Sequence, residues 1–286
     1  MPDTLKSLLD DAAEVLADAS PAPRLDAELL LAHALGKGRS HLHAHPEETP
    51  SPAALESFRG SVAARRRGEP IAYLTSKREF WSLELKVNPA TLIPRHETEL
   101  LVELALRRTP AGADWDLLDL GTGSGAVALA LARERPRCRV TATDMSAEAL
   151  AVAASNAAAL SIGNVEFVQG DWFAPLARRR FKLAVSNPPY VREHDPHLQM
   201  GDVRFEPRAA LASGADGLDD LRRIVAAASV HLEPRGWLLL EHGHDQGAAV
   251  RALLAAHGYT APDTFKDLSG RDRVSGGIRT DTPAAR

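Results

Sequence analysis

The sequence contains a single cysteine, Cys138, among 286 residues. An intrachain disulfide needs two cysteines, so none can form, and a zinc site built from several cysteines is excluded as well. No apolar run approaches the length that spans a membrane, and residues 1–5 lack the basic and then apolar pattern of a signal peptide. We therefore expect a cytoplasmic protein without a membrane partner.

Positive charge is not in excess either. Lysine and arginine together number 34 against 38 acidic residues, which gives a formal net charge of -4. This balance argues against a protein whose main task is to grip a phosphate backbone, so we expect no direct nucleic-acid substrate. Two arginine runs, residues 65–67 and 178–180, are interpreted as solvated side chains. The first could instead contact an anionic or ribosome-associated partner.

The first part of the chain, up to about Gly68, is predicted to be helical. Apolar residues recur at helical spacing in three stretches, and Gly36 stands where the second helix would end. Ser51 and Pro52 are the residue types preferred as the N-cap and the first residue of a helix. The second stretch has its apolar side at Leu25, Leu29, Leu30 and Leu35. The sequence therefore predicts a small helical bundle as an N-terminal domain, residues 1–75.

Three histidines, His41, His43 and His45, alternate with other residues. On a strand they would share one face, and a metal site would then be conceivable. Pro46 and the loop composition around it favour solvated loop residues instead. We therefore predict no metal site.

From Glu79 the pattern changes to a period of two. Trp81, Leu83 and Leu85 alternate with polar residues, which predicts a strand with one apolar face. We expect a strand or hairpin, residues 76–92, that links two domains.

Strands and helices alternate in the remainder, residues 93–286, which indicates an α/β domain with a parallel sheet. The expected strands are 115–120, 139–143, 165–169, 181–186 and 237–241, with edge strands added near 273–278. The expected helices are 98–108, 126–135, 146–160, 216–232 and 246–257, with Thr98 as a candidate cap of the first. Ligands bind beyond the carboxyl ends of the strands in such sheets, so functional residues are expected where the strands end.

A glycine-rich turn, Gly121-Thr122-Gly123-Ser124-Gly125, joins the first of these strands to its helix. Glycines let a ligand touch the backbone, and the helix that follows presents unpaired N–H groups. Asp144 ends the next strand, 19 residues after Gly125, where a carboxylate can accept both hydroxyls of a ribose. Together, these residues predict a cofactor of the adenosine type. The turn by itself would also suit a tight strand-to-helix connection.

The spacing of the glycines favours one cofactor of this type. They read G-x-G-x-G, not the dinucleotide pattern G-x-G-x-x-G, and the Walker pattern is absent. Asp119, beside the turn, would repel a pyrophosphate but would suit an ammonium group. S-adenosylmethionine carries an ammonium group and no phosphate, so it is favoured over a dinucleotide.

A further cofactor contact is predicted after the third strand, at Gly170-Asp171-Trp172. Asp171 could accept from the exocyclic amine of adenine, and the Trp172 indole could lie beside the ring. A packed tryptophan next to a capping aspartate is the alternative interpretation.

Asn187-Pro188-Pro189-Tyr190 follows the fourth strand. The two prolines end the strand, because neither has an N–H group to donate. The side-chain oxygen of Asn187 and the carbonyl of Pro188 are two fixed acceptors, which suit the two donors of an –NH2 group. Tyr190 offers a flat face to a planar amide or base. We interpret these residues as a holder for a planar –NH2 group, with Asn187, Pro188 and Tyr190 as catalytic residues and Pro189 in substrate binding. An ordinary strand-ending turn is the alternative.

The three motifs, in this order, indicate methyl transfer to an amino or amide nitrogen. A methyl sulfonium is already a good electrophile, so the main task is placement, and no strong general base is required. An amino-group methyltransferase that acts on bases of nucleic acid would use nearly the same chemistry and is the runner-up. A binding subunit without catalysis, or a nicotinamide dehydrogenase, fits less well because the turn and the motif are intact.

The chain resembles the release-factor glutamine N5-methyltransferase family over nearly its whole length. The matching segments are residues 24–31, 68–74, 78–81, 92–95, 119–125, 187–190, 205–208 and 213–214. The Asn-Pro-Pro-Tyr motif is shared with other amino-group methyltransferases, whereas the N-terminal and Pro-Arg segments are particular to this family. His96 and Ser76 depart from the proline and glycine that the family usually has there.

The resemblance implies an N-terminal helical domain that recognises the substrate, a β-hairpin linker and a class I methyltransferase domain. This domain is Rossmann-like, with a seven-stranded, mostly parallel sheet. S-adenosylmethionine, which would leave as S-adenosylhomocysteine, would bind at Gly121–Gly125, Asp144, Trp172 and Asn187. The substrate glutamine would lie at Asn187 to Tyr190. The partners implied are peptide chain release factors, and the target is the glutamine of their Gly-Gly-Gln motif.

Overall fold

The computed structural model describes residues 3–280. They form two compact units. One unit comprises the chain up to Lys77 together with Gln199–Phe205. The other comprises Arg78–Leu198 and the residues from Glu206 onward. The predicted domain boundaries contain no such return of the chain to the N-terminal unit.

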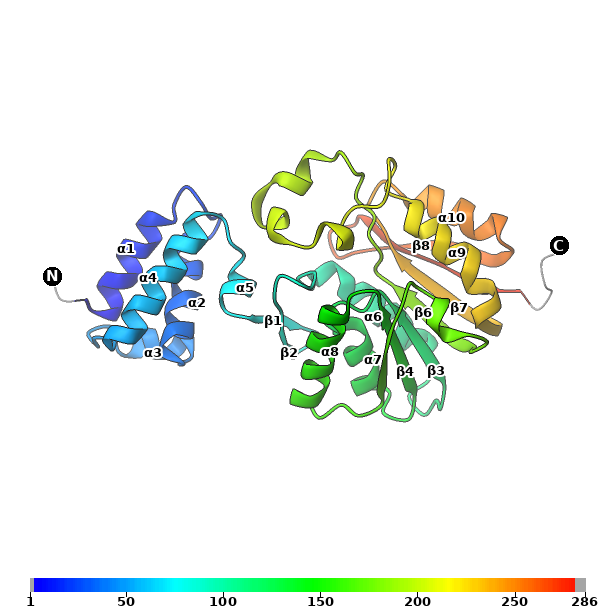
Figure 1. The fold of residues 1–286 in the computed structure, drawn as a ribbon, viewed down its shortest axis with the longest axis horizontal. Coiled ribbons are helices and arrows are strands. Elements are labelled where there is room, and N and C mark those ends of the chain that lie inside the picture. Colours follow the sequence, from blue (N-terminus) through cyan, green and yellow to red (C-terminus); the bar gives the residue numbers. More distant parts are fainter. Residues whose placement is uncertain (1–2, 281–286) are drawn as a thin grey trace. The chain divides into compact units, whose positions relative to one another are not determined.

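The N-terminal unit is helical, as predicted. Its helices are α1 (Leu5–Val15), α2 (Pro23–Leu35), α3 (Arg39–Ala44), α4 (Pro52–Arg66) and α5 (Ile71–Leu74) (Figure 1). The Ser51 side chain accepts a hydrogen bond from the N–H of Ala54 at 3.3 Å, so it caps α4 as expected. The core joins four of these helices, α1 to α4, through Leu5, Leu8, Leu9, Leu30, Leu31, Leu42 and Phe58.

The predicted apolar side of the second helix is partly wrong. Leu25 is 40% exposed, whereas Ala27, Leu30 and Leu31 are fully buried. The three buried residues form an i, i+3, i+4 stripe, and Leu25 lies outside it. The prediction considered only leucines, so it missed Ala27 and placed the buried side of α2 wrongly.

A loop was predicted for the three alternating histidines, and this prediction is wrong. His41 and His43 belong to α3, and His45 is its C-cap. Residues two apart do not face each other on a helix, so the ring of His41 contacts that of His45 at 4.4 Å between centroids. His41 Nε2 also lies 2.8 Å from the carboxylate of Glu48. Among residues 3–280, no group of three histidine, cysteine or acidic side chains could hold a metal ion.

Arg65 is buried, contrary to the prediction that the whole arginine run is solvated. Its Nε donates to Asp26 Oδ2 and its Nη1 donates to Asp202 Oδ1, both at 2.7 Å. The planar guanidinium has enough donors to pair with both carboxylates at once. Because Asp202 belongs to Gln199–Phe205, Arg65 fastens the returning segment to α2 and α4.

Strands β1 (Lys77–Phe80) and β2 (Leu83–Lys86) form a hairpin. Its two turn residues, Trp81 and Ser82, have φ of +52° and +55°. Positive φ at both positions is typical of the tight turns that join antiparallel strands. Trp81 therefore lies in the turn and not on the predicted apolar strand face, and its indole donates to Glu134 Oε1 at 3.1 Å.

The second unit is built on a seven-stranded sheet with the order β5-β4-β3-β6-β7-β9-β8. Its strands are β3 (Asp116–Leu120), β4 (Arg139–Asp144), β5 (Val165–Gln169), β6 (Phe181–Ser186), β7 (Leu232–Glu241), β8 (Tyr259–Lys266) and β9 (Asp272–Arg279). The strands β3 to β7 are parallel, and β8 and β9 are antiparallel to their neighbours. This confirms the predicted α/β fold with a mostly parallel sheet. The strand order reverses between β3 and β6, and such a switch point is where ligands bind in open α/β sheets.

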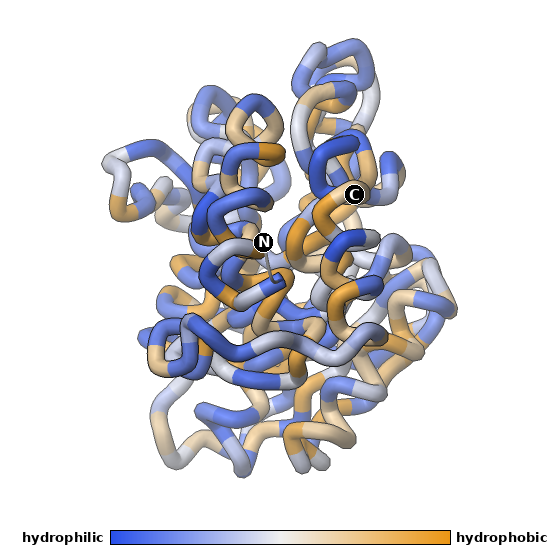
Figure 2. The backbone as a smooth tube through the Cα atoms, turned by 90° about the vertical axis from the view of Figure 1, so that its left-hand side faces the viewer, coloured by the Kyte–Doolittle hydropathy of each residue, from blue (hydrophilic) through white to orange (hydrophobic). Residues whose placement is uncertain are grey.

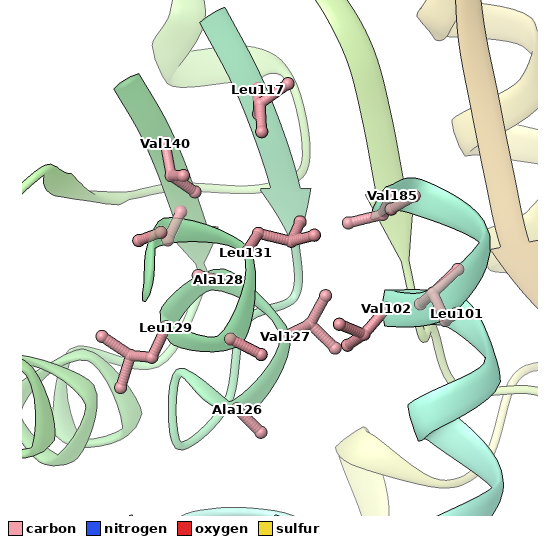
Figure 3. Close-up of a cluster of buried hydrophobic side chains, with 14 of the residues drawn as sticks. Leu101, Val102, Leu117, Ala126, Val127, Ala128, Leu129, Leu131, Val140 and Val185 are labelled. Atoms are coloured by element: carbon pink, nitrogen blue, oxygen red, sulfur yellow. The ribbon is translucent and has the colours of Figure 1, made fainter. Parts of the chain in front are cut away.

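Helices cover both faces of the sheet (Figure 1). They are α6 (Glu99–Arg108), α7 (Ala126–Glu134), α8 (Ala147–Ala159), α9 (Asp219–His231) and α10 (Gly247–Ala256). One buried cluster joins α6 and α7 to Leu117 and Val185 (Figure 3). The other joins α9 and α10 to Leu118 and Leu240. Consecutive strand residues point to opposite faces, so β3 contributes to both clusters.

Hydrophobic stretches are short throughout and are interrupted by hydrophilic residues (Figure 2). Within residues 3–280, no helix has both the length and the apolar character needed to cross a bilayer.

The register of the parallel strands brings several chain segments to one edge of the sheet. Leu120 lies opposite Thr143 on one side and opposite Ser186 on the other, and Ser186 lies opposite Leu240. The next residues along the four strands therefore lie at the same edge of the sheet. They are Gly121 and Asn187, which follow β3 and β6, and Asp144 and Glu241, which are the last residues of β4 and β7.

Candidate active site

The glycine-rich turn is held closely against the end of β4. The N–H groups of Gly121 and Thr122 donate to the carbonyl of Thr143 at 2.8 and 2.9 Å. Gly121, Gly123 and Gly125 have φ of +71°, +56° and +85°, in the region that favours glycine. The turn leads directly into α7, whose N-terminus is suited to a negatively polarised ligand group.

Asp119 lies behind this turn. Its Oδ2 accepts hydrogen bonds from Thr122 Oγ1 at 2.6 Å and from the N–H of Ala128 at 3.2 Å. Burial raises the pKa of Asp119 to about 7, although the two hydrogen bonds act in the opposite direction. Asp119 does not line the cavity described next. Its carboxylate stabilises the turn by these two hydrogen bonds. The sequence had suggested a different role, in which Asp119 would pair with an ammonium group of the ligand.

A cavity of about 510 Å³ opens at this edge of the sheet in the second unit. The predicted site residues that line it are Gly121, Gly123, Asp144, Asp171, Trp172, Asn187 and Pro189. Further walls come from two segments that the local motifs did not indicate, Pro89 to Leu92 and the residues Pro207, Ala209 and Ala210. Met145, Glu148 and Arg223 also line it and were missed.

Thr122, Ser124, Gly125, Pro188 and Tyr190 are predicted site residues that do not line the cavity. The first three support the turn or the helix packing. A Cβ on Gly125, for example, would lie 3.1 Å from the side chains of both Ala153 and Leu129. Ligand contacts of these five residues remain predictions.

The Asp144 carboxylate is held by two backbone groups. Its Oδ2 accepts from the N–H of Gly123 at 2.8 Å, and its Oδ1 accepts from the N–H of Ser146 at 2.9 Å. A carboxylate oxygen can accept more than one hydrogen bond, so both oxygens can still receive a ligand hydroxyl. The structure thus presents a pre-oriented pair of acceptors on the cavity wall.

Trp172 is fixed by residues far away in the sequence. Its Nε1 donates to Asp220 Oδ1 at 3.3 Å, and Asp220 also pairs with Arg223. Arg223 in turn forms an ion pair with Asp171. Asp171 is therefore already paired with a guanidinium, and its contact with the exocyclic amine of adenine remains a prediction. Asp220 lies 48 residues after Trp172, and no local motif indicated this contact.

We expect Gly121→Ala to impair both folding and the cavity. A Cβ on Gly121 would lie 3.1 Å from the Trp172 ring, and its φ of +71° is unfavourable for alanine. The free energy of unfolding should fall by about 1–2 kcal/mol, the cost of the left-handed region for a residue with a Cβ. Binding of S-adenosylmethionine should weaken as the indole is displaced. Chemical unfolding and calorimetric titration measure the two effects.

Gly163→Ala is the matched control. A Cβ at Gly163 would meet nothing within 4 Å, and its φ does not fall in the left-handed region. It should change neither quantity. Equal effects of the two substitutions would contradict the assigned role of Gly121.

Asn187 is oriented by a distant hydroxyl. Its Nδ2 donates to Thr98 Oγ1 at 3.2 Å, from a residue 89 positions earlier in the chain. An asparagine that merely capped its own turn would bond to neighbouring backbone instead. Thr98 ends the 3₁₀ helix η1 (His96–Thr98) and occupies the N-cap position of α6, as predicted, but its side chain makes no capping hydrogen bond there. With Nδ2 engaged, Oδ1 is left as the acceptor that Asn187 can present to the cavity.

Tyr190 is partly buried and packs against the core cluster that includes Leu118 and Leu240. Its hydroxyl donates to Glu241 Oε1 at 3.2 Å. Burial, followed by the nearby charge of Glu241, raises the pKa of Tyr190. The phenol therefore stays protonated at neutral pH and anchors the end of the motif. Glu241 was not identified as a site residue from the sequence.

Glu206 connects the two outer walls of the cavity. Its buried carboxylate accepts from the N–H of Ile93 at 2.9 Å and forms an ion pair with Arg95. Leu92 and Pro207, which adjoin these residues, both line the cavity. One carboxylate thus holds together two wall segments that are more than a hundred residues apart.

The cavity suits an adenosine that carries a cationic end and no phosphate. It offers oriented carboxylate oxygens on Asp144, an indole on Trp172 and a glycine turn that approaches the ring closely. Asp144 and Glu148 place negative charge on its wall, which disfavours a pyrophosphate. The residues present therefore fit S-adenosylmethionine.

Comparison with known proteins gives the same assignment for both parts of the chain. Residues 7–75 match the family described as PrmC N-terminal domain, and residues 96–214 match the methyltransferase small domain. A release factor glutamine methyltransferase of Pseudomonas aeruginosa is 54% identical over 90% of this chain and 92% of its own length. One of Vibrio cholerae is 51% identical over 95% and 96%. A methyltransferase structure from Pyrococcus furiosus, 19% identical, covers 69% of this chain and 89% of its own with a TM-score of 0.53, and shows the shared fold. The chain belongs to the release factor glutamine methyltransferase family.

Proposed function

We propose that this protein transfers a methyl group from S-adenosylmethionine to the side-chain amide nitrogen, N5, of a glutamine in peptide chain release factors. The target is the glutamine of their Gly-Gly-Gln motif. The name of the relatives supports this activity. The observation that carries the proposal is the bond from Asn187 Nδ2 to Thr98, which leaves Oδ1 for the substrate. An acceptor that cannot be protonated near neutral pH suits the two donors of an amide –NH2 group.

Asn187 Oδ1 and the Pro188 carbonyl accept one N–H each in this mechanism. S-adenosylmethionine supplies a methyl group on a positively charged sulfur. The amide nitrogen of glutamine is a poor nucleophile, because its lone pair is delocalised into the carbonyl group. Holding both N–H bonds favours the pyramidal nitrogen of the transition state and stabilises its growing positive charge. The prolines at 188 and 189 restrict the turn, so the two acceptors need little reorganisation.

No strong general base takes part. The nitrogen can lose its proton after the methyl group has moved, when it is far more acidic. Tyr190 does not serve as a base, because its pKa is raised and its hydroxyl is already donated to Glu241. Its role is to hold the motif, and with it the plane of the substrate amide.

The cofactor is proposed to lie along the glycine-rich turn, with its ribose on Asp144 and its adenine beside Trp172. Asp171 would share its carboxylate between Arg223 and the exocyclic amine. The N-terminal helical unit is proposed to recognise the release factor, so that the second unit need only hold the reacting groups.

Transfer of a labelled methyl group to a purified release factor tests the proposed function. We expect incorporation into the release factor and none into a variant whose Gly-Gly-Gln glutamine is replaced by alanine. Nucleic acid added as a competing substrate should take up no label. Preferential labelling of the nucleic acid would support an amino-group nucleic-acid methyltransferase instead.

A further inference from the structure

The indole of Trp172 is anchored to the cavity wall by a remote side chain. Its Nε1 donates to Asp220 Oδ1 at 3.3 Å, and both residues line the cavity. An indole has one N–H to donate and no acceptor, so this bond uses its whole hydrogen-bonding capacity. A Cβ on Gly121 would lie 3.1 Å from the same ring. The ring therefore lies against the glycine-rich turn while its N–H is bonded to the first turn of α9.

The carboxylate of Asp220 is itself held in one orientation. The hydroxyl of Ser213 donates to Asp220 Oδ2 at 2.8 Å, and its oxygen accepts from the N–H of Asp220, also at 2.8 Å. Ser213 is buried. These two bonds fix one carboxylate oxygen, so the other, Oδ1, is directed to the indole. Arg223 also pairs with Oδ1, at 3.2 Å.

Ser213 belongs to a short segment that pairs with the end of the Asn-Pro-Pro-Tyr motif. Its N–H donates to the carbonyl of Val191 at 2.9 Å. The N–H groups of Tyr190 and Val191 donate to the carbonyl of Leu211 at 3.1 and 2.8 Å. Val191 and Ala212 form an isolated parallel bridge. A continuous series of hydrogen bonds thus runs from the motif, through the serine and the aspartate, to the indole.

We infer that Asp220 is a positioning residue, which fixes the Trp172 indole relative to the Asn-Pro-Pro-Tyr motif and so sets where the adenine end of S-adenosylmethionine lies. This inference rests on the proposed function, in which the adenine lies beside Trp172. Asp220 acts through the indole and does not touch the reacting atoms. Methyl transfer needs nitrogen, methyl carbon and sulfur in line, and a misplacement of about 1 Å can cost about 100-fold in rate. The anchored indole therefore serves turnover as well as cofactor affinity.

Asp220→Ala tests this inference, because it removes the acceptor of the indole N–H and keeps the ring. We expect the affinity for S-adenosylmethionine, measured by calorimetric titration of the full chain, to fall about tenfold, in keeping with the loss of a hydrogen bond to a charged group. The rate of methyl transfer at saturating S-adenosylmethionine should fall as well. Asp220→Asn keeps an oxygen that can accept from the indole and should retain most of the affinity. Equal losses in the two variants would contradict the role assigned to Oδ1.

A double-mutant cycle separates action through the indole from a direct contact between Asp220 and the ligand. Trp172→Phe keeps an aromatic ring but has no N–H to donate. Adding Asp220→Ala to Trp172→Phe should change the cofactor affinity by less than about twofold, because the effects of coupled residues are not additive. A further tenfold loss in the Trp172→Phe background would overturn the inference.

The anchoring bond can also be observed in the protein without ligand. The chain has four tryptophans, so a ¹H–¹⁵N NMR spectrum has few indole signals, and the one lost in Trp172→Phe belongs to Trp172. We expect this signal to shift in Asp220→Ala and its proton to exchange faster with solvent, because the N–H has lost its acceptor. A signal identical to that of the wild type would refute the anchoring role.

Asp219→Ala is the matched control, because it removes the neighbouring carboxylate from the same first turn of α9. The Asp219 side chain is 59% exposed and pairs with Arg222. The substitution should leave the cofactor affinity, the rate and the Trp172 signal unchanged. Changes as large as those in Asp220→Ala would show that negative charge at the helix N-terminus is decisive, and the inference would then be wrong.

Ser213→Ala covers the case in which Asp220→Ala does not fold. It removes the hydroxyl that orients the carboxylate, so the Trp172 signal should shift and cofactor binding should weaken. Wild-type values of both quantities in Ser213→Ala would overturn the inference. Failure of the wild-type enzyme to label a release factor would instead overturn the proposed function, since neither the indole signal nor the titration depends on the methyl acceptor.

Discussion

Replacing Asn187 with alanine should lower the rate of methyl transfer by about 100-fold or more, comparable with the loss of one preorganised transition-state partner. The alanine cannot accept from the substrate –NH2, so only the Pro188 carbonyl would hold the nitrogen. The Thr98 hydroxyl would also lose its partner. Cofactor affinity should change little, because the ribose and adenine contacts lie on Asp144 and Trp172. Single-turnover rates and calorimetric titration of the cofactor separate the two effects.

Asn187→Asp sharpens this test, since aspartate has almost the same shape as asparagine. It has no N–H to donate to Thr98, and it adds a negative charge beside the buried carboxylate of Glu241. We expect a comparable loss of turnover even though one more acceptor is present. Near-normal turnover in the alanine variant would refute the role assigned to Asn187.

Replacing Asp144 with alanine should weaken the binding of S-adenosylmethionine by about 100-fold, because hydrogen bonds to a charged group contribute about 1.5–3 kcal/mol each. Two ribose hydroxyls would lose their acceptor. The N–H groups of Gly123 and Ser146 would lose theirs as well, which loosens the glycine-rich turn. Titration with S-adenosylmethionine and with S-adenosylhomocysteine measures the effect, which should be similar for both ligands.

Glu148→Ala is the control for Asp144, because it removes one negative charge from the same cavity wall. It leaves the bonds to Gly123 and Ser146 in place. We therefore expect a much smaller change in affinity. If both substitutions weakened binding equally, the charge of the wall would be decisive and the specific ribose contact would be wrong.

The strands that carry the site could be predicted closely from the sequence. β5 and β6 begin and end at the predicted residues. β6 is a largely apolar run, and β5 carries its apolar residues at Val165, Phe167 and Val168. Two prolines follow β6, and a glycine follows β5. The position of Asn187 beyond a strand end was therefore accessible from local patterns, together with the glycine-rich turn and Asp144.

The groups that orient these residues could not be predicted in the same way. Thr98, Glu206, Asp220 and Glu241 each act on a residue about 50 or more positions away. Their partners are decided by strand order and register, which no local motif contains. The sequence placed Asp119 beside the glycine-rich turn. It did not reveal that the carboxylate is hydrogen-bonded to Thr122 and does not line the cavity.

For two residues, Trp81 and Arg65, the local sequence pattern gave a wrong prediction. Trp81 continues the alternation of Leu83 and Leu85, but it lies in the hairpin turn because a two-residue connection is needed there. Arg65 belongs to a charged run at a helix end, but it is buried because its guanidinium pairs with the carboxylates of Asp26 and Asp202. In both cases tertiary partners decided the outcome.

The excursion of the chain at Gln199–Phe205 limits how this protein can be divided. These residues belong to the helical unit, yet they come between Tyr190 of the Asn-Pro-Pro-Tyr motif and Glu206, which holds Ile93 and Arg95. A truncated protein that begins after Lys77 would lack Arg65, the ion-pair partner of Asp202. It would keep Gln199–Phe205 as a loop within the second unit, without the helices that this loop belongs with. The two halves are therefore not interchangeable modules, and a chimaera with a foreign N-terminal half would have to graft this loop along with it.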